Sequence, residues 1–111
     1  MDIPVERSGD VAIAVIAVDE LDAANSAELR HGMEPILDAN RKVVIDLARV
    51  RFVDSSALGA ILSCLRYITA REGDLKLCSL SRQVRTAFEL VRMHRVFEIF
   101  GSRDEAVNAF R

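Results

Sequence analysis

The sequence has no tryptophan, and aromatic residues make up only 5% of it. Proteins that bind single-stranded nucleic acid stack the bases on aromatic side chains, so a base-stacking platform is not expected. An excess of one charge is also missing, because 15 Lys and Arg residues are balanced by 17 Asp and Glu residues. Nucleic-acid-binding modules usually carry a clear basic excess. We therefore expect no nucleic acid among the partners of this chain.

Cysteine and long apolar runs are also scarce. The two cysteines, Cys64 and Cys78, lie in apolar stretches and have no second pair beside them. That usage favours buried thiols in a reducing compartment over a structural disulfide. The N-terminal MDIPVERSGD lacks the apolar core of a secretory signal, and the longest apolar run, Val11–Val18, is too short to span a bilayer. We expect a cytoplasmic protein with no membrane span.

Apolar stretches and helical stripes alternate along the chain, which indicates an α/β fold. Its length of 111 residues suits one core, so one domain is expected over residues 1–111. The expected strands cover residues 3–7, 11–18, 42–47, 74–80 and 96–99. The expected helices cover residues 22–40 and 55–71, one that follows Ser81 and one that follows Ser102. The order β-β-α-β-α-β-α-β-α, with a hairpin first, predicts a mixed, mostly parallel sheet of about four or five strands and about four α-helices.

Single residues predict where some of these helices begin and end. Ser81 is expected to cap the third helix, and Ser102 with Glu105 has the spacing of a capping box before the fourth. Gly73 suits the end of the second helix, where a left-handed residue is common. Pro35 lies inside the first helix and is expected to kink or weaken it, because proline lacks a backbone donor.

The stretch RFVDSSALGAIL places two serines behind an aspartate, at the start of the second helix. At about 100° per residue, the apolar positions from Leu58 to Ile68 form one buried stripe, and Ser56 points directly away from it. Ser55 falls at the edge of the buried side, which makes it the better candidate for a helix cap or a buried hydroxyl. Ser56 is expected to be exposed in the first turn.

The face around Ser56 is expected to be made of small side chains and open to another protein. The residues expected on or beside it are Ala57, Gly59, Ala60, Ser63 and Tyr67. A phosphate on Ser56 would be tolerated by the first helical turn, which has unpaired N–H groups and the positive end of the macrodipole. It would add about −1.5 to −2 units of charge beside Asp54. Modification would therefore leave the fold intact and spoil a docking surface. A cap without further function remains an alternative for these serines.

The segment VVIDLARVRFVDSSALGAILSCLR resembles the central signature of the STAS domain, the sulphate-transporter and anti-sigma-factor-antagonist family. The resemblance includes the hydrophobic-Asp-Leu unit at residues 45–47 and the phe-x-Asp-Ser-Ser turn that opens the second helix. Upstream, Leu21 and Asp22 are similar to the leucine-aspartate segment before the family's first helix. Residues 75–110 resemble the last third of the domain, so the likeness covers nearly the whole chain.

This resemblance implies a single-domain antagonist of an anti-sigma factor that is itself an ATP-dependent serine kinase. The unphosphorylated antagonist would sequester that factor and so release a sigma factor. Phosphorylation of the second serine, here Ser56, would block binding, and a serine phosphatase would reset the switch. Asp22, Asp54 and Ser55 would lie beside Ser56 in the partner-binding surface. The resemblance implies no cofactor for the antagonist itself, because ATP and metal would belong to the kinase.

Two positions differ from the family pattern. Ala57 stands where glycine usually follows the second serine, and it is expected to add a methyl group to the docking face. Asp19 stands where glycine usually precedes the acidic-Leu-Asp segment, so that loop is expected to differ. Neither change removes the hydroxyl of Ser56.

Other functions fit the residues less well. A serine nucleophile needs a base and a group that orients it, and only His31 and His94 are available, without a G-x-S-x-G elbow, so no enzyme is expected. The histidines and cysteines lack the spacing of metal ligands, so no metal site is expected. A non-switching STAS scaffold or accessory subunit of a stress-signalling or lipid-transport complex stays open. The third helix and the segment after it carry a basic run that is either solvated or docks acidic groups of a partner: Arg82, Arg85, Arg92 and Arg95.

Overall fold

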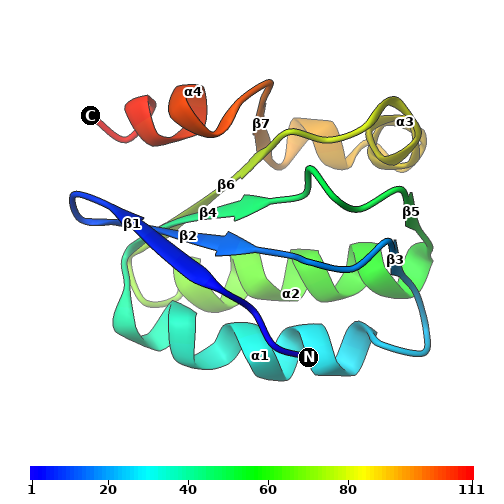
Figure 1. Ribbon diagram of the computed structural model, residues 1–111, viewed down its shortest axis with the longest axis horizontal. Helices are drawn as coiled ribbons and strands as arrows, with labels where there is room; N and C mark the ends of the chain where they lie inside the picture. The colour runs from blue at the N-terminus through cyan, green and yellow to red at the C-terminus, as the bar shows by residue number, and fades with distance from the viewer.

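A five-stranded mixed sheet forms the middle layer of the molecule (Figure 1). In the computed structural model, which describes residues 1–111, the strand order is β1-β2-β4-β6-β7. The hairpin strands β1 and β2 are antiparallel, and every other neighbouring pair is parallel. The strands are β1 (Val5–Ser8), β2 (Val11–Val15), β4 (Lys42–Asp46), β6 (Asp74–Cys78) and β7 (Glu98–Phe100). The α/β class, the hairpin and the mostly parallel sheet are confirmed.

Four α-helices cover the two faces of this sheet. They are α1 (Ser26–Ala39), α2 (Ser55–Thr69), α3 (Arg82–Leu90) and α4 (Arg103–Asn108), and the short 3-10 turn η1 (Met93–Arg95) follows α3. Figure 1 draws α1 and α2 below the sheet and α4 above it. The helices α1 and α2 pack against each other and both begin at the right-hand end of that view. None of the helices is long and apolar enough to cross a membrane.

Alternation along the central strands divides the core between the two faces. Val43 and Ile45 of β4 join the larger cluster, beneath α1 and α2, whereas Val44 joins a smaller cluster with Ala106 and Val107 of α4. Strands covered on both faces read as continuous apolar runs, as 11–18 and 42–47 do in the sequence. The strand β2 nevertheless ends at Val15, before the expected end of that run.

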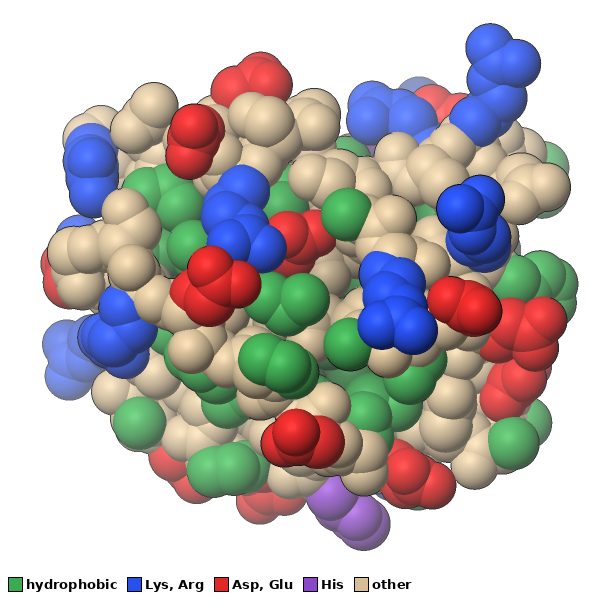
Figure 2. Space-filling model, viewed as in Figure 1, with side chains coloured by type: hydrophobic (Ala, Val, Ile, Leu, Met, Phe, Trp, Pro, Cys, Tyr) green, Lys and Arg blue, Asp and Glu red, His purple; other side chains and the backbone are tan.

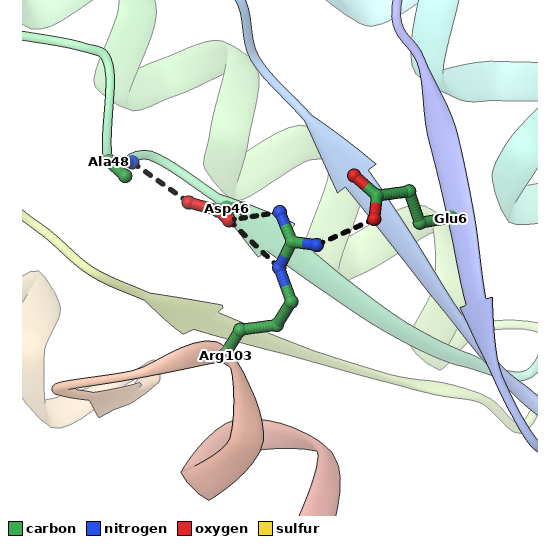
Figure 3. Close-up of polar contacts among 4 residues, drawn as sticks. All are labelled: Glu6, Asp46, Ala48 and Arg103. Atoms are coloured by element: carbon green, nitrogen blue, oxygen red, sulfur yellow. Dashed lines mark hydrogen bonds and ion pairs between the residues drawn. The ribbon is translucent and has the colours of Figure 1, made fainter.

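A partly buried ion pair attaches the start of α4 to the sheet (Figure 3). Arg103 donates from Nε and Nη2 to Oδ2 of Asp46, at 3.1 and 2.8 Å, and from Nη1 to Oε1 of Glu6 at 2.8 Å. Oδ1 of Asp46 accepts from the amide of Ala48 at 2.9 Å. The hydrogen bond to Asp46 raises the pKa of Arg103. The Asp46 carboxylate, only 8% exposed, therefore has partners for both oxygens.

The ends of the helices confirm some expectations and correct others. Ser81 caps α3 by accepting from the Val84 amide, and Ser102 accepts from the Glu105 amide at the start of α4, as expected. The helix α1 begins at Ser26 instead of near Asp22, because a turn separates the preceding short strand from the helix.

Pro35 does not end α1, which continues to Ala39. Three buried side chains of α1, those of Leu29, Met33 and Leu37, hold it against the core on either side of the proline.

The turn after α2 uses Gly73 for a different reason from the one expected. Glu72 adopts the left-handed conformation there, with φ of 63°. A Cβ on Gly73 would lie 2.6 Å from Cγ1 of Ile68 and 2.8 Å from the carbonyl oxygen of Arg41. Gly73 is therefore required by a close approach of the chain to itself, and not by a left-handed φ.

Candidate functional site

Two very short strands position the loops that precede α1 and α2. The strands β3 (Glu20–Leu21) and β5 (Phe52–Val53) pair in parallel as a second sheet, which the sequence analysis missed. Leu21 and Val53 are buried, and each is followed directly by an aspartate. The repeated apolar-Asp pair ahead of two helices is the sequence signal that could have revealed this arrangement. It brings Asp22 and Asp54 to the same end of the molecule.

The carboxylate of Asp54 joins these two loops. Its Oδ1 accepts from the amide of Ala57 at 3.0 Å and so caps α2. Its Oδ2 accepts from the amide of Ala23 at 3.0 Å, in the loop before α1. The expectation that Ser55 caps α2 or is buried is wrong, because Asp54 supplies the cap and Ser55 is exposed. Both serines are thus free of the capping role.

Exposure along α2 separates the serine-containing face from the core. Ser56, Gly59 and Ser63 are exposed, as expected. A Cβ on Gly59 would meet no atom within 4 Å, so the surface beside Ser56 is open. Ala57 and Ala60 are not on this face: they are 0% and 4% exposed.

The burial of these two alanines has a non-local cause. The helix α1 packs against α2, and Ala60 lines a shallow hollow together with Ala27 and Arg30 of α1, so the buried side of α2 extends beyond the stripe expected from apolar residues alone. The methyl group of Ala57 therefore lies inside the protein. It adds nothing to the exposed face, contrary to expectation.

Tyr67 is not brought close to Ser56. The two residues are separated by about 16 Å along the helix axis, at about 1.5 Å per residue. The Tyr67 hydroxyl donates to Oδ1 of Asp38 at 2.6 Å, and this hydrogen bond raises the pKa of Tyr67. The guanidinium of Arg71 lies 4.0 Å from the centre of its ring. Ser63, whose hydroxyl donates to the Gly59 carbonyl at 3.0 Å, lies between Ser56 and Tyr67 along α2.

Asp22 contributes a second carboxylate near the serines. It is half-buried, and its Oδ1 accepts from the amide of Ala24 at 2.9 Å. Its own amide donates to Oδ1 of Asn25 at 2.9 Å, which shapes the turn into α1. The structure thus brings together Asp22, Asp54, Ser55 and Ser56, with Gly59 one turn further along.

Replacing Asp54 with alanine is expected to lower the free energy of unfolding by about 1–2 kcal/mol, because α2 loses its cap and the tie to Ala23. Ser55→Ala, the adjacent control, is expected to stay within about 0.5 kcal/mol of the wild type. Urea denaturation followed by circular dichroism measures both. A larger loss in Ser55→Ala than in Asp54→Ala would contradict the assignment of the cap.

The histidines and cysteines form no reactive cluster. A shallow hollow between α1 and α2, which Ser56 lines, has no histidine in its lining, and His31 and His94 lie on α1 and η1. Cys64 and Cys78 are free and buried, and burial raises the pKa of the Cys64 thiol to about 11. No group of three His, Cys, Asp or Glu side chains is placed to hold a metal ion.

Charge is distributed without a dominant sign on the face that Figure 2 draws, where acidic and basic side chains are interspersed. In the basic run of α3 and η1, Arg85 pairs with Glu89 at 3.7 Å. Leu90, Val91 and Val96 in the same region are exposed.

The strand order and helix arrangement define a single α/β domain with a mixed five-stranded sheet. The chain belongs to the STAS domain family, whose model matches residues 2–106. It is 30% identical over 92 residues to the putative anti-sigma factor antagonist BtrV of Bordetella bronchiseptica, covering 82% of this chain and 79% of the relative. It is 27% identical over 112 residues to the anti-sigma F factor antagonist of Paenibacillus polymyxa, covering 98% and 93%.

Solved structures share this fold across nearly the full chain. A STAS domain protein from Planctomyces limnophilus superposes with a TM-score of 0.89 at 21% identity, covering 98% of this chain and 97% of that one. The Bacillus cell fate determinant SpoIIAA in its phosphorylated form gives a TM-score of 0.72 at 20% identity, covering 98% and 99%. At these identities the likeness establishes the fold.

Proposed function

We propose that this protein is an anti-sigma factor antagonist that works by binding and not by catalysis. It binds an anti-sigma factor with serine kinase activity and thereby releases a sigma factor. The relatives named as anti-sigma factor antagonists support this assignment, because they match most of the chain. These partners place its work in the cytoplasm.

The observation that carries the proposal is Ser56 itself. It is exposed in the first turn of α2, Asp54 already supplies the helix cap, and the neighbouring Gly59 leaves the surface open. A hydroxyl that is neither a cap nor a core group, on an open surface, is accessible to the active site of another protein. The exposed surface we propose for docking consists of Asp22, Asp54, Ser55, Ser56, Gly59 and Ser63.

Phosphorylation of Ser56 is the proposed switch. Oγ of Ser56 attacks the γ-phosphorus of ATP held by the kinase, and the bond from that phosphorus to the bridging β–γ oxygen breaks. ADP leaves, and the serine proton passes to a base of the kinase or to water. A serine phosphatase later hydrolyses the phosphate ester with water and restores the hydroxyl.

The phosphate acts on docking and leaves the fold intact. It adds about −1.5 to −2 units of charge next to the carboxylates of Asp54 and Asp22. A partner surface that complements the unmodified face would meet this charge and bulk at its centre, and like-charge contacts in an interface are costly.

Incubation with the cognate kinase and ATP tests this proposal. Intact-mass spectrometry should find one phosphate on the wild type and none on Ser56→Ala, and peptide mapping should place it on Ser56. Ser55→Ala is the matched control and should be phosphorylated like the wild type. Phosphate on Ser55 with Ser56 unmodified would overturn the assignment, and no phosphate with stable binding would favour the scaffold alternative.

A further inference from the structure

A shallow hollow between α1 and α2 lies directly beside Ser56. Its volume is about 320 Å³, and Ser56 of α2 and Arg30 of α1 both line it. Ala27 and Gly59, which also line it, have little or no side chain to fill the space. The hollow therefore has room for a group larger than a hydroxyl on the α1 side of Ser56.

The side chain of Arg30 is placed to reach this space. Both helices begin at the same end of the molecule, and Arg30 lies one turn after Ser26, the first residue of α1. Long helical side chains lean toward the N-terminus of their helix, which here is the end where Ser56 lies. Arg30 is exposed and takes part in none of the ion pairs of the structure. Its guanidinium is available to an anion.

We propose that this hollow is an intramolecular phosphate-binding site, in which Arg30 receives the phosphate carried by Ser56. The proposal rests on the proposed function, which supplies the phosphate. An arginine fork matches phosphate oxygens with two parallel hydrogen bonds, which makes it a better partner for phosphate than a point charge would be.

The charged groups around Ser56 direct the phosphate toward α1. Asp54 and Asp22 carry negative charge on the loop side, and their Oδ atoms already accept backbone amides. On the α1 side lies a second hollow, which shares Arg30 and Ser63 with the first and is also lined by His31 and Glu34. Arg30 is the cation that lines both hollows. A phosphate on Ser56 is therefore repelled by Asp54 and Asp22 on the loop side and attracted by Arg30 on the α1 side.

Such a site changes what the modified protein presents to a partner. The phosphate would hold the Arg30 guanidinium in the hollow, so phosphorylation would remove both the Ser56 hydroxyl and a free cation from the surface. No helix needs to move, because the space already exists. The modified state is then a single, ordered arrangement.

Phosphoserine introduced at position 56 during synthesis, by an expanded genetic code, tests this without any kinase. Titration followed by ³¹P NMR gives the second pKa of the phosphate, ordinarily about 6. Pairing with Arg30 favours the dianion, so Arg30→Gln should raise this pKa by about 0.5–1 unit relative to the unsubstituted phosphoprotein. Arg66→Gln, the same charge change at an exposed arginine in the last turn of α2, should leave it unchanged.

The outcome separates this proposal from the proposed function. Arg30→Gln titrating like the unsubstituted phosphoprotein would overturn the phosphate site, and Arg30→Lys restoring part of the shift would support it. A phosphoprotein that still binds the anti-sigma factor as well as the unmodified chain would refute the proposed switch, yet it would leave the titration result standing. Amide spectra of each variant confirm that the fold is retained.

Discussion

Replacement of Ser56 by aspartate is expected to weaken the complex with the cognate anti-sigma factor at least about tenfold, or about 1.4 kcal/mol. The new carboxylate lies in the first turn of α2, beside Asp54 and close to Asp22. Its charge and its added bulk both fall on the surface that Gly59 leaves open. Isothermal titration calorimetry with the purified anti-sigma factor gives the two dissociation constants.

The matched controls separate this local effect from a general effect of charge. Thr86→Asp introduces the same carboxylate at an exposed position of α3, outside the proposed surface, and should bind like the wild type. Ser56→Ala should bind like the unphosphorylated protein and should keep binding after incubation with ATP. Equal affinities for Ser56→Asp and Thr86→Asp would argue against a docking surface centred on Ser56.

Removal of the Arg103 side chain is expected to lower the free energy of unfolding by about 3 kcal/mol. Arg103→Ala would leave the carboxylate of Asp46, 8% exposed, without its cation and with only the Ala48 amide as a partner. A buried charge without a counter-ion is costly because the protein interior solvates it poorly. Urea denaturation of the wild type and the variant measures the difference.

Two further variants identify the source of that loss. Arg41→Ala removes an exposed arginine whose side chain takes part in no ion pair. It should lower the free energy of unfolding by no more than about 0.5 kcal/mol. Adding Asp46→Asn to Arg103→Ala should recover part of the stability, because the buried charge is gone. If Arg103→Ala were no more destabilising than Arg41→Ala, the ion pair shown in Figure 3 would contribute little to attaching α4.

The features that the sequence predicted correctly are those with strong local patterns. The apolar runs around β2 and β4, the stripe of α2 and the caps at Ser81 and Ser102 each depend on a few neighbouring residues. The exposure of Ser56 followed from the same periodicity. The family resemblance, which covered nearly the whole chain, agrees with the match to the STAS model.

The predictions that were wrong concern features set by contacts between residues far apart in the sequence. The two-residue strands β3 and β5 are too short to show a period, and they pair with each other across a long stretch of sequence, with Leu21 and Val53 buried. Ala57 and Ala60 are buried in a helix that packs against α1, and the periodicity of α2 alone cannot indicate that contact. The helical wheel of α2, extended back to its first residues, also made Ser55 the candidate for the cap. The cap is supplied by Asp54, the residue before the first turn.

The two hydrogen bonds of the Asp54 carboxylate have a consequence for how this domain can vary. One bond fixes the start of α2 and the other fixes the loop before α1, so the lengths of the two loops depend on each other. An insertion between Leu21 and Ala23 would pull that amide away from Asp54 and loosen the turn that carries Ser56. Such an insertion, although it lies more than thirty residues from Ser56 in the sequence, would alter the docking surface. Changes in the length of the loop before α1 are therefore constrained by the loop before α2.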